Sequence, residues 1–290
     1  MLAPPLSTNY ALVGTAFDYL LRFYCARINP EAKQGQWVGK AGLDILRRSG
    51  NARIYEMANG LFEQAQRYYL EYLQTGELKE QLLAGTIHLA KLDGIYRGHG
   101  LGNLSESNLM DVDDLDIADL RALMSLVREE NFKARKRCVL NPSFGIASVL
   151  VRGADADIIV DDQLIDIKTT KNPGLDRSYV HQLIGYHVLS ALQRVHDFEK
   201  DYQATSILKR VSIYFSRHGY MHTMLIDELI EPATFASLAK QFVNFALTPE
   251  IKQVLSAYRK WQEERLKEIA QQLLQKRERD QKQDSLSKSL

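Results

Sequence analysis

Two aspartates and a lysine lie close together in the sequence, at positions where they can assist chemistry on a phosphate ester. Asp157 directly precedes one short apolar run, and Asp166 and Lys168 alternate with the isoleucines of the next run. Carboxylate oxygens suit Mg²⁺, and a bound Mg²⁺ lowers the pKa of a water and stabilises a leaving oxygen. A neighbouring lysine orients and helps to deprotonate that water, and offsets the charge of the transition state. The three residues predict metal-assisted phosphate chemistry.

These residues are predicted to meet on one face of a β-hairpin. The two apolar runs flank Asp161 and Asp162, which are typical turn residues. Because side chains alternate between the two faces of a strand, the polar and apolar residues separate. A two-residue loop sets a register with these opposite pairs: Asp157 with Asp166, and Asp155 with Lys168. The other face carries the residues that are predicted to enter the core: Ile158, Ile165 and Ile167.

We expect Asp157 and Asp166 to hold the metal, with the backbone carbonyl of Ile167 as a third ligand. Asp155 is a further candidate ligand, and its alternative is an ordinary residue at the end of a strand. For the whole polar face, the alternative is a solvated surface with cross-strand ion pairs, each worth only about 0.2–1 kcal/mol. A metal site gives this face a purpose, which a solvated surface does not.

The same residues resemble the signature of the PD-(D/E)XK nuclease superfamily. In that signature an acid is followed by a hairpin that ends in D/E-x-K, and here Asp157 is followed by Asp166-Ile167-Lys168. The next helix is predicted to carry Gln182 and Tyr186, which resemble the Q-x-x-x-Y motif of the RecB/Cas4-like branch. Residues four apart share a helix face, so both can point at the strands. The resemblance implies metal-dependent hydrolysis of DNA, with Gln182 and Tyr186 orienting Lys168 or the phosphate.

The resemblance also directs attention to two upstream residues and to the cofactor. Gly14-Thr15-Ala16-Phe17-Asp18 resembles the G-x-x-x-H start of RecB-like nucleases, but a buried or capping Asp18 is the preferred interpretation. His88 is a candidate metal ligand from an upstream helix, with a structural histidine as the alternative. Some members of the branch hold an iron–sulfur cluster, for which Cys25 and Cys138 are too few. The expected cofactor is Mg²⁺ or Mn²⁺, without an iron–sulfur cluster.

Two segments are predicted to contact the backbone of a nucleic acid. The net charge is only +1, so any affinity must come from local patches of the surface. The first segment ends a predicted helix over residues 116–137 and contains Lys133, Arg135, Lys136 and Arg137. Its alternative is a favourable interaction of these cations with the helix dipole. The second segment follows the hairpin and contains Thr169, Thr170 and Lys171.

The order of predicted elements indicates an α/β fold with a restriction-endonuclease-like αβββαβ core at residues 116–246. A helical accessory region at 1–115 precedes this core, and a C-terminal helix with a charged tail at 247–290 follows it. The 3.6-residue periodicity predicts helices over residues 10–28, 36–49, 52–75, 77–97, 116–137, 177–197, 231–246 and 249–276. Glycine, serine and asparagine predict an exposed loop over 98–115. Strands outside the hairpin are predicted over residues 144–151, 207–216 and 220–226.

Composition and the N-terminus favour a cytoplasmic protein. With 45% hydrophobic and 25% charged residues, the chain has the composition of an ordinary soluble globular protein. No apolar run reaches the length of a membrane span, and the first ten residues lack the features of a signal peptide. We therefore expect no membrane partner.

The predicted function is that of a metal-dependent deoxyribonuclease, and several alternatives stay open. RNA is not excluded as the substrate. The Q-x-x-x-Y resemblance favours an exonuclease, whereas the absence of a fused helicase leaves a stand-alone endonuclease open. A partner such as a helicase or a defence-system subunit is compatible with both. Two other classes remain: a non-catalytic protein that binds nucleic acid or a partner, and a metal-dependent enzyme on a small phosphorylated substrate.

Overall fold

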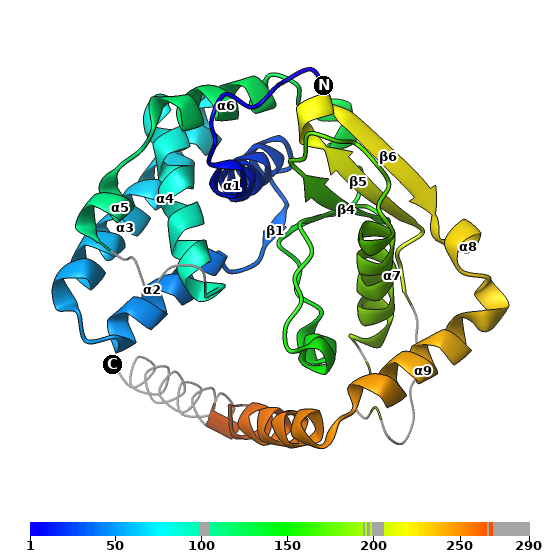
Figure 1. Cartoon of the computed structure of the whole chain (residues 1–290). Helices are drawn as coiled ribbons and strands as arrows, with labels where there is room; N and C mark the ends of the chain where they lie inside the picture. Colours follow the sequence, from blue (N-terminus) through cyan, green and yellow to red (C-terminus); the bar gives the residue numbers. More distant parts are fainter. Residues whose placement is uncertain (99–104, 194, 196–197, 199–205, 266, 269–290) are drawn as a thin grey trace, which may run out of the picture.

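Six helices form the N-terminal part of the chain, on one side of a β-sheet (Figure 1). The computed structural model describes residues 1–98, 105–193, 195, 198, 206–265 and 267–268. The helices span α1 Tyr10–Ile28, α2 Val38–Arg48, α3 Ala52–Thr75, α4 Glu80–Tyr96, α5 Glu106–Met110 and α6 Asp114–Met124. The first four confirm the helices predicted in this part, with small differences at their ends. In α3, for example, Asn51 caps the first turn and Gly76 ends the helix with a φ of 72°.

A six-stranded mixed sheet follows, and its strands lie in the same order as in the chain. The strands span β1 Lys33–Gln34, β2 Cys138–Leu140, β3 Ile158–Val160, β4 Gln163–Lys168, β5 Arg210–Phe215 and β6 Tyr220–Leu225. The pairs β1–β2 and β4–β5 are parallel, and the other neighbours are antiparallel. Helix α7, Arg177–Leu192, makes the crossover that the parallel pair β4–β5 requires. The predicted α/β class is therefore confirmed.

The C-terminal part consists of short helices on the other side of the sheet from α1 (Figure 1). Helix α8 spans Ile226–Leu229, a 3₁₀ turn spans Pro232–Thr234, and α9 spans Phe235–Ala246. Residues 249–265 are also helical. Residues 267–268 are helical as well, and residues 269–276 of the predicted helix and the charged tail lie outside the described residues. The helix predicted over 177–197 ends earlier, at Leu192, and residues 194, 196 and 197 lie outside the described residues. None of the described helices is long and apolar enough to cross a membrane.

The predicted hairpin of β3 and β4 forms in the predicted register. Ile158 pairs with Ile165, so the same register places Asp157 across from Asp166 where the ladder ends. Asp161 occupies the turn with a φ of 54°, a conformation that aspartate tolerates better than most residues. The pairing of Asp155 with Lys168 is wrong, however. Asp155 instead forms an antiparallel bridge with Ser143, because the chain leaves the hairpin before this position.

Each face of the sheet packs against its own group of helices. The predicted core residues of the hairpin, Ile158, Ile165 and Ile167, are buried in an apolar cluster shared with α1, α3 and α4. On the opposite face, Ile159 and Leu164 pack with α7 and α9. The N-terminal helices and the sheet therefore share one core, which fixes α1 beside the hairpin.

The strand predicted over residues 144–151 is wrong, because Gly145–Val151 forms a 3₁₀ helix. The buried residues Phe144, Ala147 and Leu150 recur at every third position, which matches three residues per turn. Ser148 supports this turn, since its hydroxyl accepts from the Phe144 N–H and donates to the Ala154 carbonyl. The strand of this region is β2, which lies earlier in the chain.

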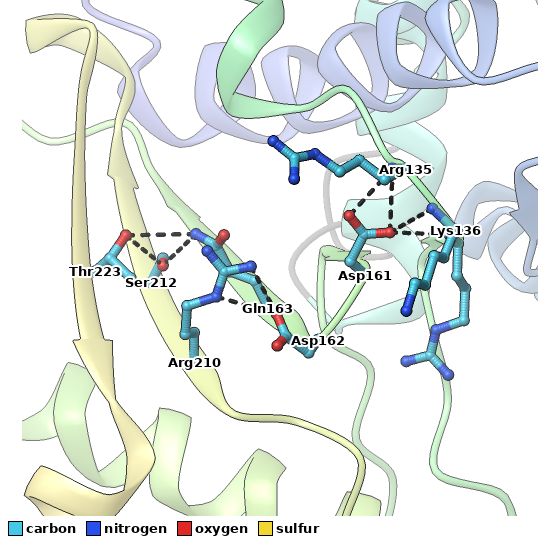
Figure 2. Close-up of polar contacts among 9 residues, drawn as sticks. Arg135, Lys136, Asp161, Asp162, Gln163, Arg210, Ser212 and Thr223 are labelled. Carbon is cyan, nitrogen blue, oxygen red and sulfur yellow. Dashed lines mark hydrogen bonds and ion pairs between the residues drawn. The ribbon is translucent and has the colours of Figure 1, made fainter.

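The helix predicted over residues 116–137 is also wrong at its C-terminal end, since α6 ends at Met124. The basic residues that follow lie in an irregular segment that leads into β2, so they do not lie at the end of α6. Asp161 holds this segment, because its carboxylate accepts hydrogen bonds from the backbone N–H groups of Arg135, Lys136 and Arg137 (Figure 2). The loop predicted over 98–115 is interrupted by α5.

Candidate active site

A cavity of about 650 Å³ lies where α1, the end of α4, the β3–β4 hairpin and α7 come together. Its volume is within the range of about 300–1,000 Å³ that is typical of small-molecule sites. The lining includes every residue predicted to be catalytic: Asp157, Asp166, Lys168, Gln182 and Tyr186. Asp155 and Ile167 also line it. The structure thus gathers the predicted residues of the hairpin and of α7 in one place.

The hairpin supplies two carboxylates of different environments. Asp157 Oδ2 accepts a hydrogen bond from the backbone N–H of Ile167 at 2.6 Å, which fixes this carboxylate against β4. Asp166 is only 3% exposed, and its Oδ2 lies 2.8 Å from Nζ of Lys168. This oxygen is buried and, among the described residues, accepts no well-aligned hydrogen bond. It therefore keeps a free lone pair for a further ligand.

Helix α7 holds Lys168 in position through two side chains one turn apart. Lys168 Nζ donates to Gln182 Oε1 at 3.0 Å, and Gln182 Nε2 donates to the Tyr186 hydroxyl at 2.8 Å. The Tyr186 ring in turn stacks on Phe144, with ring centroids 5.5 Å apart. Lys168 Nζ also lies 4.9 Å from the ring centroid of Tyr179. The ammonium group is thus fixed by contacts from strand and helix together.

One face of α1 completes the site. Thr15, Asp18 and Arg22 are spaced by three and four residues, so they lie in a row along the cavity. Asp18 therefore lies beside the hairpin carboxylates, in a buried setting that agrees with the interpretation preferred from the sequence. The sequence analysis missed Arg22; the spacing of Thr15, Asp18 and Arg22 on one helix face was a signal for it, but this spacing does not say what the face contacts. Asp93 on α4 and Arg97, the residue that follows this helix, also line the cavity.

Burial raises the pKa of the carboxyl groups in this site, and the charge of Asp157 adds to this for Asp166 and Asp18. Burial and then the charge of Asp157 raise the pKa of Asp166 to about 7. Burial also raises the pKa of Asp157, and burial together with Asp157 raises that of Asp18 well above its usual value. Burial acts to lower the pKa of Lys168, but the carboxylates, Asp166 first, outweigh it and the pKa is raised overall. The site thus favours added positive charge, either protons or a cation.

The donor set fits a hard divalent cation. The buried Asp166 oxygen contacts Lys168 and has a further lone pair for a cation, and burial together with the charge of Asp157 disfavours its ionised form unless positive charge is added. Mg²⁺ takes oxygen ligands and keeps several waters, so two carboxylates and a backbone carbonyl are an adequate protein contribution. Within the described part of the chain, no three His, Cys, Asp or Glu side chains stand close enough to form a ready-made metal site. Waters and substrate oxygens must then complete the coordination.

The structure does not bring His88 to this cavity. Its Nδ1 lies 3.0 Å from the backbone carbonyl oxygen of Leu109, in the contact between α4 and α5. Burial and then Lys91 lower the pKa of His88 to about 4, so the ring is neutral at ordinary pH. The ligand prediction for His88 is therefore wrong, and its role is structural.

The residues at the exit of β4 lie near the cavity but bind other parts of the protein. The Ser216 hydroxyl donates to Thr169 Oγ1 at 3.0 Å. Lys171 Nζ donates to the Tyr10 hydroxyl at 3.0 Å and lies 4.2 Å from the centroid of its ring. Thr170 Oγ1 accepts a hydrogen bond from the Asn172 N–H. The side chains of Thr169, Thr170 and Lys171 are not part of the cavity lining.

The basic segment before β2 lies at the turn end of the hairpin, away from the carboxylates (Figure 2). Lys133 donates to the carbonyl oxygen of Ile28 and so caps the C-terminus of α1. Arg135 and Lys136 are exposed. Arg137 lines a second cavity of about 520 Å³, which shares only Asn141 and Asp155 with the candidate site. The segment therefore lies away from the carboxylates, and its predicted contact with the backbone of a nucleic acid stays a prediction.

The chain was compared with family models, with curated proteins and with solved structures, and none of the three comparisons gave a match.

Proposed function

We propose that this protein is a metal-dependent nuclease that hydrolyses phosphodiester bonds in DNA. The observation that carries the proposal is the arrangement of Asp157, Asp166 and Lys168 around one cavity, with Gln182 bonded to the lysine. The two acids and the lysine come from a hairpin and the glutamine from the following helix, which is the order in the PD-(D/E)XK signature. DNA as the substrate rests on that resemblance.

Asp157, Asp166 and the backbone carbonyl of Ile167 would hold Mg²⁺ or Mn²⁺. When bound, such an ion polarises a phosphoryl oxygen and makes a coordinated water acidic. The hydrogen bond from the Ile167 N–H fixes the orientation of the Asp157 carboxylate. Its other oxygen would therefore bind the metal without a further change of the side chain. Asp166 is buried beside it, which keeps bulk water away from the reacting centre.

Lys168 contributes a charge and hydrogen bonds rather than a basic amine. The carboxylates raise its pKa, so its ammonium group stays protonated at neutral pH. In this state Lys168 donates to the attacking water or to a phosphoryl oxygen and stabilises the negative charge that develops there. Gln182 and Tyr186 keep the ammonium in place, because their hydrogen-bonded chain ends on a ring stacked against Phe144.

Cleavage of three DNA substrates by the purified protein tests this proposal. Linear double-stranded, linear single-stranded and covalently closed circular DNA are incubated with Mg²⁺ or Mn²⁺. We expect metal-dependent cleavage that falls by about 10²–10³-fold in Lys168→Ala, the usual effect of losing a group that stabilises the transition state. Lys240→Ala, at an exposed position on α9, is the control and retains activity.

The substrate pattern separates the alternatives. Cutting of the closed circle identifies an endonuclease, and cutting of linear DNA alone identifies an exonuclease. Cleavage of RNA but not DNA revises the substrate. No cleavage of any substrate, or equal cleavage by Lys168→Ala and the wild type, contradicts the assignment. In that case, retained DNA binding favours the non-catalytic alternative.

A further inference from the structure

Arg22 is a buried cation that faces the candidate active site. It lies on α1 one turn after Asp18, is only 7% exposed and lines the cavity. Its guanidinium lies 4.6 Å from the ring centroid of Tyr19. Its Nη1 donates to Asn141 Oδ1 at 3.2 Å. The side chain is thus held by a ring and by an amide.

The orientation of Asn141 allows its side chain to hold the guanidinium of Arg22. Its side-chain amide Nδ2 donates to the carbonyl oxygen of Gln36, which leaves Oδ1 directed at Arg22. Its backbone N–H donates to the carbonyl oxygen of Asp157, so the same residue is joined to the hairpin. It adopts a φ of 50°, which is uncommon for a residue other than glycine. The side chain and the backbone of Asn141 thus join Arg22 to the hairpin.

The partners of Arg22 do not neutralise its charge. None of the ion pairs among the described residues involves Arg22. The other deeply buried arginine, Arg217, differs in this respect, because both of its terminal nitrogens bond to the carboxylate of Asp119. Burial raises the pKa values of the nearby Asp18 and Asp157 and the charge of Arg22 acts to lower them, but neither carboxylate forms an ion pair with it. An anion that enters the cavity would give the guanidinium a direct partner.

The charge of the cavity lining leads to the same conclusion. With every group ionised, the lining has five carboxylates and four cations, on Asp18, Asp93, Asp155, Asp157 and Asp166 and on Arg22, Arg97, Arg152 and Lys168. They leave one negative charge, which one divalent ion converts to one positive charge. A phosphodiester group carries one negative charge and balances it.

We propose that Arg22 binds a phosphate of the substrate next to the phosphate that is cleaved. This inference rests on the proposed function. Four residues of α-helix separate Arg22 from Asp18 by about 6 Å along the axis, a distance comparable to that between successive phosphates of one nucleic-acid strand. Arg22 thereby selects a polynucleotide over an ester with a single phosphate. Asn141 is the residue that positions its guanidinium.

Two substrates and three variants test this inference. Bis(p-nitrophenyl) phosphate has one phosphate, and a thymidine oligonucleotide has many. In Arg22→Met we expect the KM for the oligonucleotide to rise about tenfold or more, the usual effect of losing a charged hydrogen bond. Hydrolysis of the single-phosphate ester falls clearly less than that of the oligonucleotide, because only the oligonucleotide has a second phosphate for Arg22 to bind. Arg22→Lys gives an intermediate KM, and Arg27→Met, an exposed arginine on the same helix, is the control.

Binding without metal supplies a readout that does not need catalysis. With EDTA present, the fluorescence anisotropy of a fluorescein-labelled oligonucleotide gives the affinity at several salt concentrations. We expect Arg22→Met to bind about tenfold more weakly and with a salt slope smaller by about 0.7, the value for one phosphate contact on a single strand. Thermal unfolding checks each variant, and Arg22→Lys carries the test where Arg22→Met is not folded.

The outcomes separate the failure of this inference from that of the proposed function. Binding that depends on Arg22 without any hydrolysis overturns the nuclease proposal and keeps the phosphate site. Hydrolysis with an unchanged KM and affinity in Arg22→Met overturns the phosphate site alone. Equal losses on both substrates show that Arg22 is the counter-ion of the carboxylates, which also overturns it. Neither binding nor hydrolysis by the wild type overturns both.

Discussion

At the scale of single residues, the site depends on charges that are held close together out of water. Asp166 is almost fully buried, yet its neighbours are another carboxylate as well as Lys168. Like charges and burial both disfavour the ionised form, so the folded protein without metal holds protons that the unfolded chain would release. The residues needed for metal binding are therefore a source of instability when no metal is bound.

The pH dependence of stability tests this conclusion. The pKa of Asp166 is about 7 in the folded protein and about 3.9 in an unfolded chain. Because the folded pKa is the higher one, the stabilisation by the bound proton is complete below pH 4 and is lost as the pH rises through 7. With EDTA, the free energy of unfolding of wild type should fall from pH 5 to pH 8 by about 2 kcal/mol more than that of Asp166→Asn.

Urea denaturation at the two pH values measures this difference, with Glu264→Gln, at an exposed position, as the control that follows wild type. Addition of Mg²⁺ at pH 8 should stabilise the wild type and leave Asp166→Asn unchanged. The same pH dependence in wild type and Asp166→Asn would contradict the raised pKa. A stabilisation of both proteins by Mg²⁺ would place the metal elsewhere.

At the scale of elements, the sequence was sufficient to predict those helices and strands in which apolar residues recur with a clear period. The apolar stripe of α1 and the alternation in β3 and β4 predicted these elements and the register of Asp157 with Asp166. The 3₁₀ helix Gly145–Val151 was mistaken for a strand, because a short apolar run gives little information about its period. The two-residue strand β1 has no pattern of its own, since it exists only through its pairing with β2.

The hairpin turn is anchored on both sides by tertiary contacts, and this gives a test at the same scale (Figure 2). The Asp161 carboxylate accepts from three backbone N–H groups, and Arg210 Nη2 donates to Asp162 Oδ1 at 2.6 Å. Asp161→Ala removes the acceptor of these hydrogen bonds. It also places alanine at a φ of 54°, a backbone conformation that alanine tolerates less well than aspartate does. We expect a loss of about 2 kcal/mol in the free energy of unfolding.

Asp161→Asn is the matched variant, because asparagine keeps a carbonyl acceptor and tolerates this φ, so it should lose clearly less. Urea denaturation measures both variants. Equal stability of Asp161→Ala and wild type would show that the turn does not hold residues 135–137 in place.

At the scale of the whole molecule, the site is assembled from parts that are far apart in the sequence. The hairpin acids and Gln182 were predictable, because they lie within one stretch with recognisable spacing. The positions of Asp18 and Arg22 were not, because they depend on how α1 packs against the sheet. No local pattern contains that information. The docking of the N-terminal helices therefore decides whether the metal ligands and the proposed phosphate site face each other.

A buried ion pair contributes to this docking. Arg217 follows β5, is 1% exposed, and bonds to both carboxylate oxygens of Asp119 on α6 at 2.8 and 3.0 Å. Its Nη1 also donates to the carbonyl oxygen of Ala3, so the pair joins the sheet to α6 and to the segment before α1. Arg217→Met leaves Asp119 buried without a partner, which should lower the free energy of unfolding by about 3–5 kcal/mol.

The double variant Arg217→Met, Asp119→Leu removes both charges and should recover a large part of this loss, because the cost comes mainly from the unpaired carboxylate. Urea denaturation of the wild type, both single variants and the double variant gives the coupling energy directly. If the double variant is as unstable as the sum of the single ones, the two residues do not act as a pair. In the folded double variant, an oligonucleotide KM close to the wild-type value would show that apolar packing alone fixes α1 beside the hairpin.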